Sequence, residues 1–230
     1  MDKRKFDELI NARSGNRPVV LIKNLLNGKQ ELYYPDQKGG AQVMDEQLLS
    51  GIMESFRSDC SQLLETDNGQ VFIQVFQAPL RMILVGAVHI SQHLIPIASS
   101  CDYQVILIDP RQAFADAERF PGIDVITAWP DEALQRLDPD RRSAIITLTH
   151  DPKLDDPALE TALASEAFYI GALGSRKSHT ARVERLLEKG FSHEQLDRIH
   201  APVGLDIHAR SPAEIAVSIM GEITLKLHGG

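Results

Sequence analysis

Residues 168–182 read FYIGALGSRKSHTAR, an apolar run that ends in glycines and opens directly into a polar helical segment. Glycine lets the backbone come close to a ligand, and the first N–H groups of a helix carry the positive end of its dipole. The turn is therefore a candidate seat for an acidic or phosphorylated small molecule. Its candidate residues are Gly171, Gly174, Ser175 and Arg176. The alternative is that the glycines only close a tight turn and that the arginine is solvated.

From Arg81 onward, short apolar runs alternate with longer amphipathic segments, which is the pattern of repeated βα units in a parallel sheet. The predicted strands are residues 82–85, 105–109, 124–127, 144–149 and 168–170. The predicted helices are residues 90–100, 131–137 and 157–165, a segment from 175 to about 189, and two more that begin at Ser192 and Ser211. We therefore expect an α/β fold with a Rossmann-like parallel sheet.

The first 78 residues have a different pattern. Helices are predicted at residues 2–12 and 45–56, and strands at 19–25, 31–34, 63–66 and 71–76. The last two strands flank Asp67-Asn68-Gly69, which is typical of a tight hairpin turn. This predicts a small α+β domain over residues 1–78, followed by the Rossmann-like domain over residues 79–230.

Composition excludes several partners. The chain has 230 residues and a formal net charge of −8, so it lacks the basic balance that a nucleic-acid partner requires. No apolar run approaches the roughly 20 residues that span a bilayer, and the charged N-terminus lacks the apolar core of a secretory signal. We expect no membrane partner and a cytoplasmic location. Cys60 and Cys101 lie in unrelated contexts without metal-ligand spacing, which predicts no metal site and no disulfide.

A Rossmann-like opening follows the first strand of the larger domain. Gly86 begins the tight turn, and Asp109 ends the next strand, where a dinucleotide fold places its ribose-binding acid. The glycine pattern of dinucleotide-binding turns is incomplete. Val88 replaces the glycine that lets the backbone approach a pyrophosphate, and Ser91 replaces the glycine that lets the helix pack closely on the strand. NAD(P) is therefore a less favoured ligand. Asp109 and Arg111 remain candidates for binding a ribose or a pterin edge; alternatively, Asp109 only caps the following segment.

Polar side chains also stand at the ends of other strands. His150 and Asp151 come directly after the fourth strand, and such strand ends line the ligand crevice of an open α/β sheet. They are candidates for hydrogen-bonding a ring or holding a proton, although Asp151 before a proline is good turn chemistry by itself. His89 follows the first strand. His200 and Asp206 lie in an apolar loop, whose packing over the sheet is an alternative reason for its order.

Six segments in the same order as in a known family cover residues 81–225: GAVHISQHL, IDPR, ERFP, LTHDPKLDDPAL, FYIGALGSRKSHTAR and IHAPVGLDIHARSPAEIAVSI. In these segments the chain resembles the XdhC/CoxI family of accessory proteins for molybdenum hydroxylases such as xanthine dehydrogenase. The resemblance implies a chaperone that binds molybdenum cofactor (molybdopterin), protects it while a cysteine desulfurase installs sulfur, and passes it to the apo-hydroxylase. It also implies a homodimer.

The resemblance gathers the candidate residues into one cofactor-binding site. These residues are Gly86, His89, Asp109, Arg111, His150, Asp151, Gly171, Gly174, Ser175, Arg176 and Asp206. The departure from the family lies at the other end of the chain, because the GSxPRxxGAxM-like and GGCxE-like stretches are not legible. Lys38-Gly39-Gly40-Ala41 has the glycines without the cysteine.

Three functions therefore stay open. The first is the cofactor-binding chaperone, which is not an enzyme. The second is an NAD(P)-dependent oxidoreductase, and the third is a ligand-free interaction subunit that pairs with a second, cysteine-bearing XdhC-like protein. The sequence shows no Ser/His/Asp nucleophile arrangement, HExxH motif or Walker glycine loop, so self-contained hydrolytic chemistry is not expected.

Overall fold

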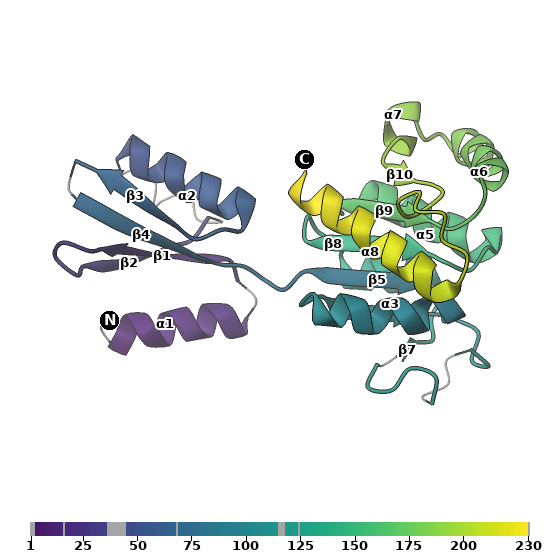
Figure 1. Ribbon diagram of the computed structural model, residues 1–230, viewed down its shortest axis with the longest axis horizontal. Helices are drawn as coiled ribbons and strands as arrows, with labels where there is room; N and C mark the ends of the chain where they lie inside the picture. The colour runs from purple at the N-terminus through teal and green to yellow at the C-terminus, as the bar shows by residue number, and fades with distance from the viewer. Residues whose placement is uncertain are drawn as a thin grey trace. The chain divides into compact units, whose positions relative to one another are not determined.

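The computed structural model describes residues 3–15, 17–35, 45–67, 69–114, 118–123 and 125–229. Parts of the sequence predictions fall outside these ranges, namely Asp2 of the first helix, the glycine stretch at residues 38–41, Asn68 of the hairpin turn and residue 124 of a strand. The chain divides into two compact units, residues 1–78 and 79–230 (Figure 1). Among the described helices, none combines the length and the apolar character needed to cross a membrane.

The smaller unit is an antiparallel sheet with a helix on each face (Figure 1). Its strands, in the spatial order β2-β1-β4-β3, are β1 (Val19–Asn24), β2 (Gln30–Tyr33), β3 (Gln62–Thr66) and β4 (Gly69–Phe76), and its helices are α1 (Lys3–Ser14) and α2 (Glu46–Ser58). Val19 packs in one cluster with Leu9 of α1, whereas Val20 packs with Ile52 of α2. Because successive strand side chains point to opposite faces, β1 is covered on both sides.

The larger unit contains a six-stranded parallel sheet in the order β10-β9-β8-β5-β6-β7. Its strands are β5 (Arg81–Val85), β6 (Gln104–Ile108), β7 (Val125–Ile126), β8 (Ser143–Thr147), β9 (Tyr169–Ala172) and β10 (Ile199–His200). Leu84 of β5 pairs with Leu107 of β6 and with Ile146 of β8, and all three are fully buried. Central strands covered on both faces read as continuous apolar runs, as these do.

Helices cover both faces of this sheet. On one face lie α3 (His89–Ser100) and α8 (Pro212–His228); on the other lie α4 (Pro130–Leu137), α5 (Pro152–Ala164), α6 (Arg176–Glu188) and the short α7 (His193–Leu196) (Figure 1). A parallel sheet of βα units between two helical layers is a Rossmann-like α/β fold. The predicted fold class is confirmed, including the small α+β part that precedes the sheet.

The last helix begins where its sequence signals place it. Ser211 is the N-cap of α8, and its side chain and that of Glu214 form a capping box. Pro212 occupies the first turn, where its missing N–H has no helical partner to lose. Ile219 and Ile223 are fully buried on the face that packs against the sheet. Both the start of α8 and its buried face thus agree with the prediction.

The start of α5 is a correction, because the helix begins at Pro152 and not at residue 157. Asp151 is the N-cap, and its carboxylate accepts a hydrogen bond from the Lys153 N–H at 3.0 Å. Pro157 lies inside the helix, where a proline costs a backbone hydrogen bond. The burial of Leu154 and of the following apolar face offsets that cost. Pro152, at the first position of the helix, therefore marks the start of α5 better than Pro157 does.

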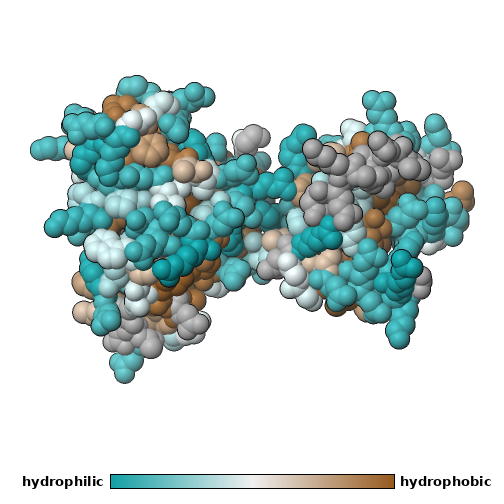
Figure 2. Space-filling model, turned by 180° about the vertical axis from the view of Figure 1, so that it is seen from behind, coloured by the Kyte–Doolittle hydropathy of each residue, from teal (hydrophilic) through white to brown (hydrophobic). Residues whose placement is uncertain are grey.

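The outer surface of the larger unit is mostly hydrophilic in the view from behind, with smaller hydrophobic areas between polar side chains (Figure 2). The largest exposed hydrophobic fractions in this unit belong to Leu225, Val217 and Trp129, at 60%, 55% and 50%. Single exposed hydrophobic side chains are normal on a protein surface and do not by themselves mark a partner. The edge of the sheet, where the strands turn into helices, is therefore the stronger candidate for a functional site.

Candidate functional site

The strand order of the large sheet reverses at β5. β6 lies on one side of β5 and β8 on the other, so the carboxyl ends of β5 and β8 form the topological switch point. Ligands of open α/β sheets bind in the crevice at such a point. Among the segments that leave this edge, the β5–α3, β8–α5 and β9–α6 turns carry most of the predicted site residues.

The β5–α3 turn requires glycine at its first position. Gly86 has φ +120°, and a Cβ added there would lie 2.9 Å from the Thr149 Cγ2. The hydroxyl of Ser91 donates to the Gly86 carbonyl at 2.6 Å, so this serine closes the turn from the helix side. The positive φ and the close approach to Thr149 together explain the glycine without a ligand.

The N-terminus of α3 has no side-chain cap, and of its first three residues only His89 is exposed. Val88 is the N-cap and provides no side-chain hydrogen bond, and the N–H groups of His89, Ile90 and Ser91 find no acceptor in the described part of the chain. In contrast, side chains cap α5, α6 and α8. Uncapped N–H groups together with the helix dipole attract an anion. His89, a predicted site residue, is exposed at this helix end.

Asp109 and Arg111 form a clamp next to that turn. Asp109 is fully buried, and its carboxylate accepts hydrogen bonds from the Ala87 N–H at 2.8 Å and from the Arg111 N–H at 3.0 Å. The Arg111 guanidinium donates to both carboxylate oxygens, at 2.9 and 2.8 Å. Burial alone would raise the pKa of Asp109, but these hydrogen bonds and the Arg111 charge hold it below its ordinary value. The clamp ties the end of β6 to the β5–α3 turn.

This clamp bears on the dinucleotide interpretation. A Rossmann enzyme needs a free carboxylate at the end of its second strand to bind ribose hydroxyls. Here both Asp109 oxygens are already occupied by protein donors. Arg111, whose side chain is 33% exposed and stacks over Phe114 at 4.2 Å, is the member of the clamp that can meet a ligand.

The β8–α5 turn is organised by a residue that sequence reasoning missed. Asp155 is 1% exposed, and its Oδ1 accepts hydrogen bonds from the Thr149 hydroxyl at 2.6 Å and the Thr149 N–H at 3.3 Å. Burial raises the pKa of Asp155, against the hydrogen bonds from Thr149 and the charges of Arg182 and His150. His150 has φ +60° and is exposed, and Asp151 caps α5.

In the β9–α6 turn, Gly174 has φ +135°, and the Ser175 hydroxyl accepts a hydrogen bond from the Ser178 N–H at 3.2 Å. The N–H groups of Arg176 and Lys177 have no partner among the residues that the structure describes, and both side chains are exposed. This turn therefore presents two free helical amides beside a glycine. An anion site at this turn stays a prediction.

Gly171 lies inside β9 and not in the turn, which corrects the predicted strand end at residue 170. A Cβ added to Gly171 would lie 2.6 Å from the Val203 Cγ2 and 2.8 Å from the Tyr169 Cε1. The glycine is thus explained by packing within the sheet layer. Of the two glycines expected at the seat, only Gly174 is part of the turn.

A second buried charge that sequence reasoning missed lies on α6. Arg182 is 4% exposed, and its Nη2 donates to the Leu173 carbonyl at 3.0 Å, just before the turn. The helical period contained a signal: Arg182 lies four residues before the fully buried Leu186, as Asp155 lies four residues before the fully buried Leu159. A charged residue on the core face of a helix marks a special role, because such residues are rarely buried without a partner.

The loop after β10 separates two other predicted residues from the turns. The side chain of Asp206 is 83% exposed and lies 3.6 Å from His208. His200 stacks on Tyr169 at 4.7 Å and lies 3.2 Å from Glu222 of α8, which also accepts hydrogen bonds from the Tyr169 hydroxyl and the Gly204 N–H. Burial alone would raise the pKa of Glu222; these hydrogen bonds keep it below its ordinary value. His200 and Glu222 therefore link the loop after β10 to β9 and α8.

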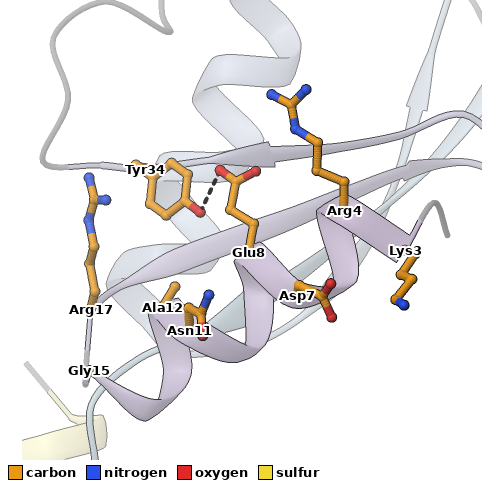
Figure 3. Close-up of a pocket in the computed structure, with 9 residues that line it drawn as sticks. All are labelled: Lys3, Arg4, Asp7, Glu8, Asn11, Ala12, Gly15, Arg17 and Tyr34. Carbon is orange, nitrogen blue, oxygen red and sulfur yellow. Dashed lines mark hydrogen bonds between the residues drawn. The ribbon is translucent and has the colours of Figure 1, made fainter.

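A hollow of about 920 Å³ lies in the smaller unit (Figure 3). Its lining comes from α1 and the adjacent segments: Lys3, Arg4, Asp7, Glu8, Asn11, Ala12, Gly15, Arg17 and Tyr34. The Tyr34 hydroxyl donates to Glu8 at 3.0 Å, and Arg17 stacks over the Tyr34 ring at 4.2 Å. Small-molecule sites are mostly apolar with few polar groups, and this mixed-charge surface lacks that composition. We place the candidate site at the sheet edge.

Comparisons with known proteins identify the family of the chain. The family model described as the XdhC Rossmann domain matches residues 82–223, and the chain belongs to this family. Molybdenum cofactor insertion chaperone PaoD of Escherichia coli strain K12 is 37% identical over 120 residues, which is 51% of this chain and 37% of PaoD. A probable xanthine dehydrogenase subunit of Bacillus subtilis strain 168 is 33% identical over 154 residues, 66% of this chain and 44% of that protein.

One further protein and one solved structure are also similar to this chain. Uncharacterized protein YqeB of Escherichia coli strain K12 is 31% identical over 170 residues, 72% of this chain and 30% of YqeB. A crystal structure of a xanthine dehydrogenase from Bacillus halodurans has a TM-score of 0.71 at 21% identity and covers 98% of this chain and 64% of that chain, which shows the shared fold. The chain spans less than half the length of the three curated relatives.

Proposed function

We propose that this protein is a cytoplasmic, non-enzymatic accessory protein that binds molybdenum cofactor as cargo and assists its insertion into a xanthine dehydrogenase-type molybdenum hydroxylase. The observation that carries the proposal is that helix amides without an acceptor among the described residues stand at one edge of the sheet, at the uncapped start of α3 and at Arg176 and Lys177 of α6. The relatives named as a molybdenum cofactor insertion chaperone and as part of a probable xanthine dehydrogenase support this cargo and this client.

The cargo fits the chemistry of the edge in two parts. Its phosphate is placed at the β9–α6 turn, on the free amides beside Gly174 and Ser175 and near Arg176. Its pterin ring is placed toward the β5–α3 turn, where Gly86 and His89 lie beside the clamp of Asp109 and Arg111. His150 and Asp151 extend the same edge, whereas Asp206 would meet cargo only from the surface loop. The main polar partner of the ring on the clamp side is Arg111, since Asp109 is already bonded.

Titration of the purified full chain with molybdopterin at low micromolar concentration tests this proposal. Saturable binding is expected, and Arg176→Ala should weaken it. Arg136→Ala is the matched control, because Arg136 is 73% exposed and lies in the last turn of α4, the helix end opposite to the sheet edge. No detectable association of the wild-type protein with molybdopterin would dismiss the proposal. A saturable NADH signal in place of molybdopterin binding would instead favour the oxidoreductase.

A second candidate is an interaction subunit that works with a cysteine-bearing XdhC-like protein. The cysteine of the larger unit favours it, because Cys101 does not lie at the carboxyl edge of the sheet. Cys60 follows α2 in the smaller unit, and Cys101 caps the far end of α3, about 18 Å along the helix from the β5–α3 turn. In the described ranges, no group of three His, Cys, Asp or Glu side chains is arranged to hold a metal.

Co-purification distinguishes the two candidates. The chaperone should carry stoichiometric molybdenum and pterin after expression in a host that makes the cofactor, as a monomer or as a homodimer. The interaction subunit should instead copurify with a cysteine-bearing homologue, with a hydroxylase or with a cysteine desulfurase, and carry neither. Assistance with sulfuration is proposed only if, in the first outcome, a cysteine desulfurase is found on the protein together with the cofactor.

A further inference from the structure

A buried arginine lies beneath the β9–α6 turn. The Arg182 Nη2 donates to the Leu173 carbonyl, and a Cβ added to Gly174 would lie 3.9 Å from the same nitrogen. The side chain therefore reaches back along α6 to the residues that open the turn. The guanidinium therefore lies beside Leu173 and Gly174, where the turn begins.

Two donor nitrogens of this arginine are unused. Nε and Nη1 of Arg182 are buried and make no hydrogen bond to the described residues. Burial lowers the pKa of Arg182, yet an arginine side chain remains charged in proteins. A buried cation without full hydrogen bonding is costly unless negative charge offsets it. An anion bound at the turn would supply that charge.

The negative groups already near Arg182 offset it only in part. Asp155 interacts with its charge, but no ion pair within 4.0 Å joins the two side chains, and the Asp155 Oδ2 has no partner in the described chain. Asp156 forms an ion pair with Arg185, whose Nε and Nη2 donate to the two carboxylate oxygens at 2.5 and 3.0 Å. His179 adds no negative charge, and burial and the Arg182 charge lower its pKa. No carboxylate of the described residues therefore forms a direct ion pair with Arg182.

Arg176 and Lys177, the other two cations of the turn, differ from Arg182 in their exposure to solvent. Arg176 and Lys177 are exposed, so water and dissolved ions screen their charges. A buried charge is screened much less. The contribution of Arg182 to the seat should therefore persist at a salt concentration that removes the contribution of the exposed pair.

We propose that Arg182 is the main cation of the phosphate seat at the β9–α6 turn and that Asp155 reduces its field. The ligand class is a phosphate monoester or free phosphate, bound by the amides of Arg176 and Lys177 and stabilised by the charge of Arg182. The inference rests on the proposed function, because the same turn receives the cargo phosphate. Arg182 is a positioning residue, since it acts through the turn and its field.

Calorimetric titration of the full chain with inorganic phosphate, at low and at high NaCl, tests this inference. A pH of about 8 keeps phosphate and the carboxylates ionised. Arg182→Met should lower phosphate affinity by about tenfold or more at both salt concentrations. Arg182→Lys should restore most of it. The loss in Arg176→Ala should be about two- to threefold at low salt and vanish at high salt.

Asp155→Asn separates electrostatics from packing. It keeps the acceptor for Thr149 but removes the charge, so phosphate should bind about two- to fivefold more tightly. A general loss of packing would weaken binding instead. The inference is overturned if folded Arg182→Met binds phosphate within about twofold of wild type, or if Asp155→Asn binds more weakly. Should Arg182→Met fail to fold, Asp155→Asn decides the matter: tighter phosphate binding supports the inference and weaker binding overturns it.

A parallel molybdopterin titration of the wild type keeps the two proposals distinguishable. Phosphate binding with the predicted pattern, but without molybdopterin binding, would leave the seat intact and overturn the proposed cargo. Molybdopterin binding that is insensitive to Arg182 and Asp155 would support the cargo and overturn the assignment of Arg182. No binding of either probe by the wild type would overturn both.

Discussion

The buried clamp between Asp109 and Arg111 gives the sharpest prediction for stability. Asp109→Asn removes the negative charge and replaces one acceptor oxygen by a donor, which then faces the N–H groups of Ala87 or Arg111. Breaking a buried ion pair costs about 3–5 kcal/mol. Arg111 is 33% exposed at its side chain and can turn toward water, so we expect the lower end, about 3 kcal/mol.

Urea unfolding measures this effect in the larger unit alone, because Trp129 is the single tryptophan of the chain and lies in that unit. For a unit of this size, about 3 kcal/mol corresponds to a fall in Tm of about 6–12 °C. Asp206→Asn is the control; its side chain is 83% exposed, and the expected change is within about 0.5 kcal/mol. If Asp109→Asn lowered the free energy of unfolding by less than about 1 kcal/mol, the stabilising role of the clamp would be refuted.

The same clamp predicts a pH dependence. Because the pKa of Asp109 is lower in the folded protein, its contribution is fully present above the ordinary carboxyl pKa of about 3.9. The contribution is lost as the pH falls through the lower, folded pKa. The stability difference between wild type and Asp109→Asn should therefore shrink in acid. An equally large difference at all pH values would point to a packing defect instead.

Three further predictions concern the sheet and its covering loop. Gly171→Ala should destabilise the larger unit by about 1–3 kcal/mol, and Val203→Ala should relieve part of that loss; a neutral Gly171→Ala would refute the packing argument. Burial raises the pKa of Tyr103 to about 12, so Tyr103→Phe should remove a late component from the ultraviolet titration of the tyrosines; loss of a component near 10 would contradict this. Glu222→Gln should cost about 1–3 kcal/mol at neutral pH in chemical unfolding, with the difference shrinking in acid as Glu222 is protonated, while an unchanged free energy of unfolding would show that its bond to Tyr169 is unimportant.

The larger sheet was predictable because its strands are apolar and its helices amphipathic. The predicted strand at residues 82–85 corresponds to β5 (Arg81–Val85), and the capping residues Ser192 and Ser211 correctly mark the starts of α7 and α8. β10 was not predicted, because its two residues begin a segment with Pro202 and Gly204 that has the pattern of a loop. Strand ends were less certain still, as the position of Gly171 inside β9 shows.

The candidate site was predictable only where the chain leaves the sheet. Sequence reasoning found the turns, because glycines and polar residues after apolar runs mark strand ends. It could not show that the carboxylate of Asp109 is already bonded to Ala87, because that contact joins two different strand ends. It also passed over Asp155 and Arg182, whose burial depends on how α5 and α6 pack on the sheet. Tertiary packing, which sequence periodicity indicates only in outline, decides both points.

The central claim is that the cargo lies along the sheet edge, with its phosphate on the free amides of α6 and its pterin ring at the start of α3. Backbone amide chemical shifts of isotope-labelled protein, recorded while molybdopterin is added, test it most directly. Saturable changes in chemical shift are expected for the amides at the start of both helices. These are the amides of His89, Ile90 and Ser91 in α3 and of Arg176 and Lys177 in α6. Saturable shifts confined to other parts of the chain, with these five amides unchanged, would contradict it.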